Sequence, residues 1–144
     1  METIFKLKQF MFSFFHVVDK SFQEDLSITL PQFMVLIAIN NNPKGTQAVL
    51  AEFRKITPAG ISKQINILIK KKLIARKNNK DDKREHSIIL TPKGKKIYEE
   101  GMKIFRKHQE NIFKDISKES VKKMNSTLDK MILKVNEGFI KSYK

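Results

Sequence analysis

The sequence predicts a mainly α-helical fold of six helices with one small β-hairpin. Apolar residues recur at helical spacing in most of the chain, and a threonine or serine precedes most of these periodic segments as a helix cap. Two short stretches of branched residues flank a charged turn, which is typical of a hairpin. The 144 residues show no internal repeat and no linker, so we expect a single domain, residues 1–144.

Two helices are expected near the N-terminus. Apolar side chains from Ile4 to Phe22 recur at helical spacing, so residues 3–22 should form an amphipathic helix whose phenylalanine-rich face needs a cover. A second helix should begin after Thr29 and is apolar nearly all round, which is typical of a central helix. A run of asparagine, proline and glycine then ends it.

Two helices joined by a tight turn should follow. Thr46 can cap a short helix, QAVLAEF, and Thr57 with Pro58 can start a longer one that runs to about Lys71. Proline fits the first helical position because the N–H that it lacks would be unpaired there.

The longer of these two helices has two unlike faces. Ile61, Ile65 and Leu68 fall on one side, which we expect to face the core. The opposite side is small near its start, so it can approach base edges in a DNA major groove, and its longer donors can reach guanine acceptors. A solvated surface helix is the alternative. The residues of this side are Ala59, Lys63, Asn66 and Lys70, with Gly60 and Ser62 flanking them.

A β-hairpin should follow, from residues 73–79 and 86–90 around a charged tip. Lys80, Lys83 and Arg84 lie in this tip beside Asp81 and Asp82. A basic ribbon next to a groove-binding helix can reach a minor groove, where negative potential attracts arginine, and a nearby aspartate can hold that arginine in place. The alternative is an ordinary turn with an exposed ion pair.

Two long helices complete the chain. Thr91 and Pro92 repeat the cap-plus-proline start, and Ser117 can cap the last helix, which has an apolar face from Val121 to Ile140. A short helix, a tight turn, a second helix and a basic hairpin are the parts of a winged helix-turn-helix. We therefore expect the helix-turn-helix at about residues 46–71 and the wing at about residues 73–91.

Composition narrows the classes of function. A formal net charge of +14 and a sequence pI near 10.0 indicate a polyanionic partner, either nucleic acid or an anionic membrane surface. The chain has no cysteine, which excludes redox switching through thiols and suits the cytoplasm. No stretch reaches about 18 uninterrupted apolar residues, and no small-residue cleavage site follows the first segment, so we expect neither a membrane span nor a targeting sequence.

Residues with catalytic or metal-binding chemistry are sparse. His16, His86 and His108 lack the spacing of a metal motif, and surface or interface histidines are favoured over a site shared with nearby glutamates. The sequence has no Gly-rich phosphate loop and no nucleophile elbow. We expect no catalytic residues, no metal and no cofactor.

Four segments together resemble the MarR family of transcriptional regulators: LPQFMVLIAI, TQAVLAEF, TPAGISKQINILIKKKLIARK and DDKREHSIILTPKGKKIYEE. The wing carries the most specific part of the resemblance. The family pattern there is Asp-x-Arg, then a strand of branched residues that ends in Leu-Thr-Pro-x-Gly, and this chain reproduces it. The chain departs from the family at Lys72, where glycine is common, and at the turn EFRKIT, which lacks a glycine and carries Arg54 in place of an apolar residue. The wing match consists of Asp82, Arg84, Leu90, Thr91, Pro92 and Gly94.

The resemblance implies a sequence-specific, DNA-binding transcriptional regulator of the repressor type, with double-stranded DNA as its partner. Arg84 would enter the minor groove, and Asp82 would position it. The implied DNA-binding residues are Thr57, Ala59, Gly60, Ser62, Lys63, Gln64, Asn66, Asp82, Lys83 and Arg84.

The resemblance also implies a homodimer joined by residues 1–25 and 95–144, around a DNA-binding lobe of residues 28–94. A dimer would bury the apolar faces of the first and last helices, and its symmetry predicts recognition helices about 34 Å apart on a pseudo-palindromic operator. Anionic aromatic ligands often bind between the dimer helices and the lobe in this family, so a small-molecule effector is an expected partner. Its candidate residues, each singly more typical of a core, are Phe10, Phe14, His16, Phe33, Ile37 and Phe105.

Two other classes of function are the alternatives. A nonspecific architectural nucleic-acid-binding protein would depend on phosphate contacts alone and show no sequence preference. A peripheral membrane protein would use the phenylalanine-rich first helix, but a helix buried in a dimer leaves no apolar face for lipid, so we expect no membrane partner.

Overall fold

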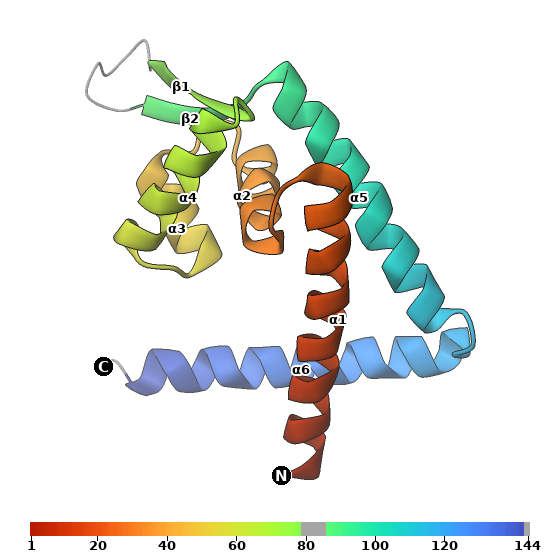
Figure 1. The fold of residues 1–144 in the computed structure, drawn as a ribbon. Coiled ribbons are helices and arrows are strands. Elements are labelled where there is room, and N and C mark those ends of the chain that lie inside the picture. Colours follow the sequence, from red (N-terminus) through yellow and green to blue (C-terminus); the bar gives the residue numbers. More distant parts are fainter. Residues whose placement is uncertain (79–85, 143–144) are drawn as a thin grey trace. The chain divides into compact units, whose positions relative to one another are not determined.

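The computed structural model describes residues 1–78 and 86–142, with side chains as far as residue 137. In these residues it has the six helices and the two-stranded hairpin that the sequence predicts (Figure 1). The chain divides into two compact units, Met1–Phe105 and Arg106–Lys144, and the boundary falls within helix α5 (Pro92–Phe113). The tip of the wing, residues 79–85, lies outside the described residues.

Helices α1 (Glu2–Leu26) and α2 (Leu30–Asn41) are joined by a short, well-capped connection. The side chain of Thr29 accepts a hydrogen bond from the backbone N–H of Gln32 at 3.3 Å, and Gln32 Oε1 accepts from the N–H of Thr29 at 3.1 Å. The carboxylate of Asp19, on α1, accepts from the N–H of Leu30 at 2.6 Å. This last bond fixes the first turn of α2 to α1.

Helix α2 forms the centre of the core, as its apolar composition predicts. Phe33 is fully buried and packs against Phe22 of α1, with ring centroids 4.5 Å apart, and against Tyr98 of α5. A Cβ on Gly101 would lie 2.2 Å from the Phe33 ring, so the missing side chain allows α5 to approach α2 closely.

The helix-turn-helix consists of α3 (Gln47–Arg54) and α4 (Pro58–Lys70), and both predicted threonine caps are confirmed. Thr46 Oγ1 accepts from the N–H of Val49 at 3.4 Å, and Thr57 Oγ1 accepts from the N–H of Gly60 at 3.0 Å. Lys55 adopts φ 50° in the turn, because no glycine is present there to take the left-handed conformation.

The hairpin pairs β1 (Ile74–Asn78) with β2 (His86–Leu90) in antiparallel register. A short third pairing joins it to the helix-turn-helix: Thr46 forms a bridge with Ser87, and the N–H of Ile88 donates to the carbonyl of Gly45 at 3.0 Å. The base of the wing is therefore fixed to the residues that begin α3. Helices α2, α3 and α4 lie beside one another next to the hairpin (Figure 1).

Lys72 takes the left-handed conformation that its position requires, with φ 61°. Its N–H donates to the carbonyl of Ile69 at 2.8 Å, and the N–H of Leu73 donates to the carbonyl of Leu68 at 3.0 Å, which ends α4. Most proteins place glycine at such a residue because a Cβ is disfavoured there.

The second unit contains the end of α5 and helix α6 (Lys118–Ser142), which Ser117 caps as predicted. Its apolar residues are largely uncovered within the unit: Ile132 is 57% exposed and Val135 is 69% exposed. The N-terminal half of α1, in the first unit, also leaves apolar side chains uncovered, with Phe5 60% and Phe12 75% exposed. None of the helices in the described part of the chain combines the length and the apolar character needed to cross a membrane.

Replacing Lys72 with glycine should raise the free energy of unfolding by about 1 kcal/mol, because a left-handed backbone costs a residue with a Cβ roughly that much. Urea denaturation of the wild type and the variant would measure the difference. Lys70→Gly removes the same charge from the last turn of α4 and should instead lower this free energy by about 0.5–1 kcal/mol. Equal destabilisation by both substitutions would contradict the account of this turn.

Candidate nucleic-acid interface

Burial fixes the orientation of α4. Ile61, Ile65 and Leu68 each have 0% exposure, which confirms that this side of the helix faces the core. The opposite side is therefore open to solvent. Its exposed side chains are Ala59, Lys63, Asn66 and Lys70.

The first turn of α4 presents little side-chain bulk. Pro58 occupies the first helical position, Ala59 is exposed, and Gly60 and Ser62 are half-exposed. The Thr57 hydroxyl accepts the capping hydrogen bond from the N–H of Gly60, so its role in this structure is to cap the helix. This end of a helix carries the positive end of the helix dipole and suits an approaching anion.

Gln64 differs from its neighbours on α4. Its side chain is half-buried, and Oε1 is buried without a hydrogen-bond partner among the described residues. Lys63 and Asn66, in contrast, are exposed. The predicted DNA-binding residues of α4 thus share a face, with Gln64 at its inner edge.

The wing adds cations that the sequence analysis did not single out. Arg76 and Lys77 are exposed at the outer end of β1, after the buried Ile74 at its start. The signal was present in the sequence, because two basic residues follow the apolar start of the strand. Asp82, Lys83 and Arg84 lie outside the described residues, and their role remains a prediction.

Charge is unevenly distributed along the chain. Residues 28–94 contain 13 Lys and Arg against 4 Asp and Glu, whereas residues 1–27 contain 3 against 4. Residues 95–144 are also basic, with 13 Lys and Arg against 7 Asp and Glu, so the lobe and the C-terminal segment share the positive charge. The first helix is not basic, which disfavours its use on an anionic membrane surface.

A cavity of about 520 Å³ opens beside α1, α2 and the end of α3. It is mainly apolar, and Arg54 is the basic side chain at its edge. The Nε atom of Arg54 is buried without a partner among the described residues, and burial lowers the pKa of this guanidinium below its ordinary value. The lining residues are Phe12, Phe15, His16, Asp19, Leu30, Pro31, Met34 and Arg54.

The six predicted effector residues are distributed over α1, α2 and α5. Of them, only His16 borders the cavity beside Arg54. Phe14 contacts Phe105 edge to face, with centroids 5.4 Å apart, and also stacks with Phe10. Phe33 is fully buried, and Ile37 packs against the core.

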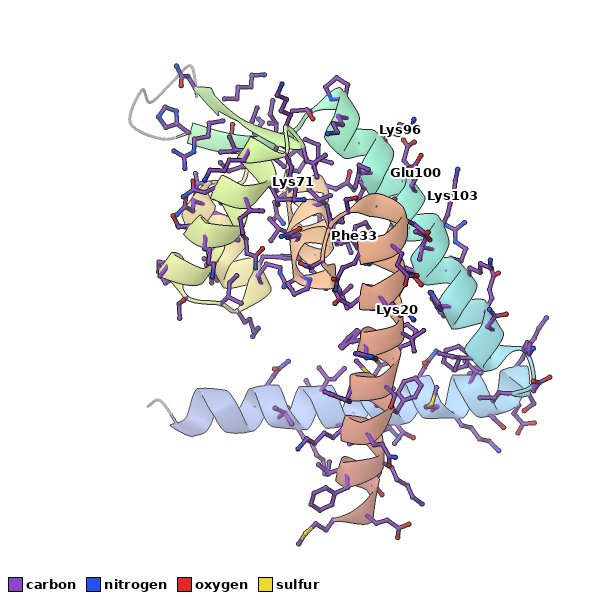
Figure 2. The ribbon with its side chains drawn as sticks, viewed as in Figure 1. Lys20, Phe33, Lys71, Lys96, Glu100 and Lys103 are labelled. Carbon is purple, nitrogen blue, oxygen red and sulfur yellow. The ribbon has the colours of Figure 1, made fainter. Side chains whose placement is uncertain are left out.

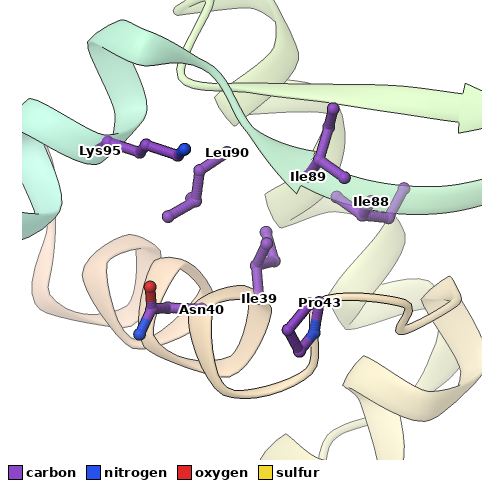
Figure 3. A pocket seen from close by; sticks show the side chains of 7 residues that line it. All are labelled: Ile39, Asn40, Pro43, Ile88, Ile89, Leu90 and Lys95. Carbon is purple, nitrogen blue, oxygen red and sulfur yellow. The ribbon is translucent and has the colours of Figure 1, made fainter.

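A smaller hollow of about 310 Å³ lies at the root of the wing (Figure 3). Its lining comes from the end of α2, from β2 and from the start of α5, and it is mostly aliphatic. Lys95 contributes one ammonium group at its edge, while the Asn40 amide donates to the Tyr98 hydroxyl at 3.2 Å.

The histidines are dispersed over α1, β2 and α5. His16 stacks on Phe12 with centroids 6.5 Å apart, and His86 is exposed at the start of β2. In the described part of the chain, no three His, Asp or Glu side chains come together in a group that could hold a metal ion.

Comparison with known proteins gives one family and one fold. The model of the MarR family matches residues 26–85, which span α2, the helix-turn-helix and the start of the wing. No curated protein matches the sequence significantly.

Solved structures match the chain over nearly its full length. A DNA complex of MepR from Staphylococcus aureus has a TM-score of 0.78 and 24% identity, covering 90% of this chain and 93% of that one. A MepR mutant from the same organism has a TM-score of 0.74 and 25% identity, covering 93% and 97%. A MarR/EmrR family regulator from Acinetobacter sp. ADP1 has a TM-score of 0.81 and 15% identity, covering 94% and 96%.

Arg54→Met should leave the free energy of unfolding unchanged within about 0.5 kcal/mol, or raise it. Methionine retains an apolar stem of similar length and has no buried Nε to desolvate. Arg54→Ala also removes the stem and should be the less stable variant. Thermal denaturation followed by circular dichroism would compare them, and a strongly destabilised Arg54→Met would show that the guanidinium has a partner that stabilises the fold.

Proposed function

Because the chain belongs to the MarR family of winged helix-turn-helix transcriptional regulators, we propose that it represses transcription as a homodimer on a pseudo-palindromic operator. The observation that carries this proposal is the orientation of α4, whose core-facing stripe is fully buried and whose outer face is small at its start and basic further on. We assign it no catalytic role.

Reading of bases is proposed for the outer face of α4. The small side chains of Ala59 and Gly60 permit close approach to the major groove, while Lys63 and Asn66 extend donors beyond them. Arg84, positioned by Asp82, is proposed for the minor groove on the family resemblance. MepR of Staphylococcus aureus, which has the same fold, has been solved in complex with DNA.

Homodimerisation is proposed through residues 1–25 and 95–144. The uncovered apolar side chains of α1 and of α6 support it, since burying one large apolar side chain contributes about 1.5–3 kcal/mol. Two copies that cover these faces mutually would also present two α4 helices with two-fold symmetry.

A small, planar, anionic ligand is proposed as the effector, bound in the cavity beside Arg54. The apolar lining suits a flat hydrophobic body, and the unpartnered Nε of Arg54 is a donor for a carboxylate or phenolate. Arg54 also lies directly before the left-handed turn that leads into α4. A ligand at this cavity would therefore act on the placement of α4.

A nonspecific architectural protein is the second candidate, and the excess of basic over acidic residues in the lobe is the observation that favours it. Such a protein would bind with a strong salt dependence but without base readout. The two candidates differ in whether affinity depends on the DNA sequence.

Selection from a library of random duplexes, at physiological salt and with excess competitor DNA, should enrich an inverted repeat with half-sites about ten base pairs apart. This spacing follows if the two α4 helices of the dimer enter successive major grooves on one face of the DNA duplex. Binding without enrichment would contradict base reading and favour the architectural protein, and enrichment of a single unrepeated site would contradict the proposed dimer.

Lys63→Ala should weaken binding to the selected operator by about 1–3 kcal/mol and relax the preference at one base pair of each half-site. Lys130→Ala is the matched control, because it removes the same charge from an exposed residue of α6. Titration of both variants with operator and mutated duplexes would separate the effects. An equal and small loss in both variants would place the base contacts elsewhere.

A further inference from the structure

Lys71, the C-cap residue of α4, joins the ends of three helices. Its ammonium Nζ donates to the carbonyl of Ser27, the C-cap residue of α1, at 2.7 Å. Its own carbonyl accepts from Nζ of Lys93, in the first turn of α5, at 3.2 Å. Figure 2 labels Lys71 at the end of α4.

The end of α4 is bound to the start of α5 by further hydrogen bonds. The Thr91 hydroxyl donates to the carbonyl of Lys72 at 2.7 Å, and the N–H of Thr91 donates to the carbonyl of Leu73 at 3.0 Å. A Cβ on Gly94 would lie 1.9 Å from the carbonyl oxygen of Leu73, so the two segments are in direct backbone contact. The three consecutive carbonyls after α4 are therefore all engaged by the residues that begin α5.

The ammonium of Lys71 supplies a positive charge at the C-terminal end of α1. The last turn of a helix leaves carbonyls unpaired at the negative end of the dipole, where a cation is favourable. The last turn of α1 contains no basic residue, and Ser27 follows it in the left-handed conformation with φ 55°. Lys71 thus provides a cation for the end of α1, whereas the last turn of α4 already contains Lys70 and gains a second cation from Lys93.

We propose that Lys71 is a positioning residue, which fixes the direction of α4 for DNA recognition without contacting DNA. The proposal rests on the function proposed above. The buried stripe of α4 determines which side faces the core, whereas the bonds of Lys71 hold its C-terminal end against α1 and α5. Contacts to base edges need this precision, because they fail when a donor is displaced by a fraction of an ångström.

The alternative role for Lys71 is a phosphate contact, and Lys70 provides the comparison. Lys70 is exposed one residue earlier on the helix, whereas Lys71 is half-buried and its ammonium is already bonded to Ser27. A phosphate contact contributes equally to all DNA sequences and to the salt dependence of binding. A positioning residue contributes to the preferred sequence alone.

The test uses the full chain and three variants, with affinity for the selected operator and for an unrelated duplex measured over a range of salt. Lys71→Met keeps the aliphatic stem and removes the donor, and Lys71→Arg restores a donor. Lys130→Met is the matched control, because it removes the same charge from an exposed residue of α6. Lys71→Met should lose about tenfold in operator affinity, the loss of one charge-assisted hydrogen bond, with little change in nonspecific affinity or salt slope. Lys71→Arg should recover most of the loss.

Several outcomes would overturn the proposal. A fall in both affinities with a smaller salt slope in Lys71→Met would make Lys71 a phosphate contact, and unchanged operator affinity would remove its role. Failure of Lys71→Arg to recover the loss would show that the donor is not its cause. Circular dichroism at the assay temperature gives the folded fraction, to which each affinity is corrected. A wild type that binds both duplexes equally would overturn the proposed function, and this role of Lys71 with it.

Discussion

Ile61, Ile65 and Leu68 bury one side of α4 in the core, and this burial decides which side chains of the helix remain outside. Complete burial of three such side chains contributes on the order of several kcal/mol, so rotation of α4 about its axis would cost more than the surface contacts on its other side could return. The small and basic face is thereby presented outward. The proposed base reading by α4 and the proposed symmetry of the dimer both depend on this orientation.

Hydrogen bonds and backbone conformations at the helix ends add to the constraint that burial places on α4. The threonine caps fix where α3, α4 and α5 start, and Lys55 and Lys72 accept left-handed backbones where the chain must turn. At the C-terminal end of α4, backbone carbonyls accept hydrogen bonds from an ammonium, a hydroxyl and an amide group at the start of α5. The helix is consequently held along its length by apolar packing and at its end by directional bonds, which have different physical origins and different sensitivities to mutation.

The caps, the hairpin and the inner face of α4 could be predicted because they depend on residues close together in the sequence. At Lys72, which replaces a common glycine, the sequence left open whether the residue would take an unfavourable conformation or the turn would change, and the structure shows the left-handed conformation. The bond between Lys71 and Ser27 spans 44 residues and has no local signature. Helical periodicity groups the phenylalanines of α1 without showing which neighbour each one meets, so it did not indicate that Phe12 and Phe15 line a cavity with Arg54.

A map of backbone amide chemical shifts, recorded as the protein is titrated with its selected operator duplex, would show directly whether α4 is the DNA-binding helix. We expect the largest changes in residues 57–70 and on β1, while the exposed lysines of α6 change little. Large changes on α6 with an unperturbed α4 would contradict this expectation, because the DNA-binding surface would then be a basic face that plays no part in the helix-turn-helix.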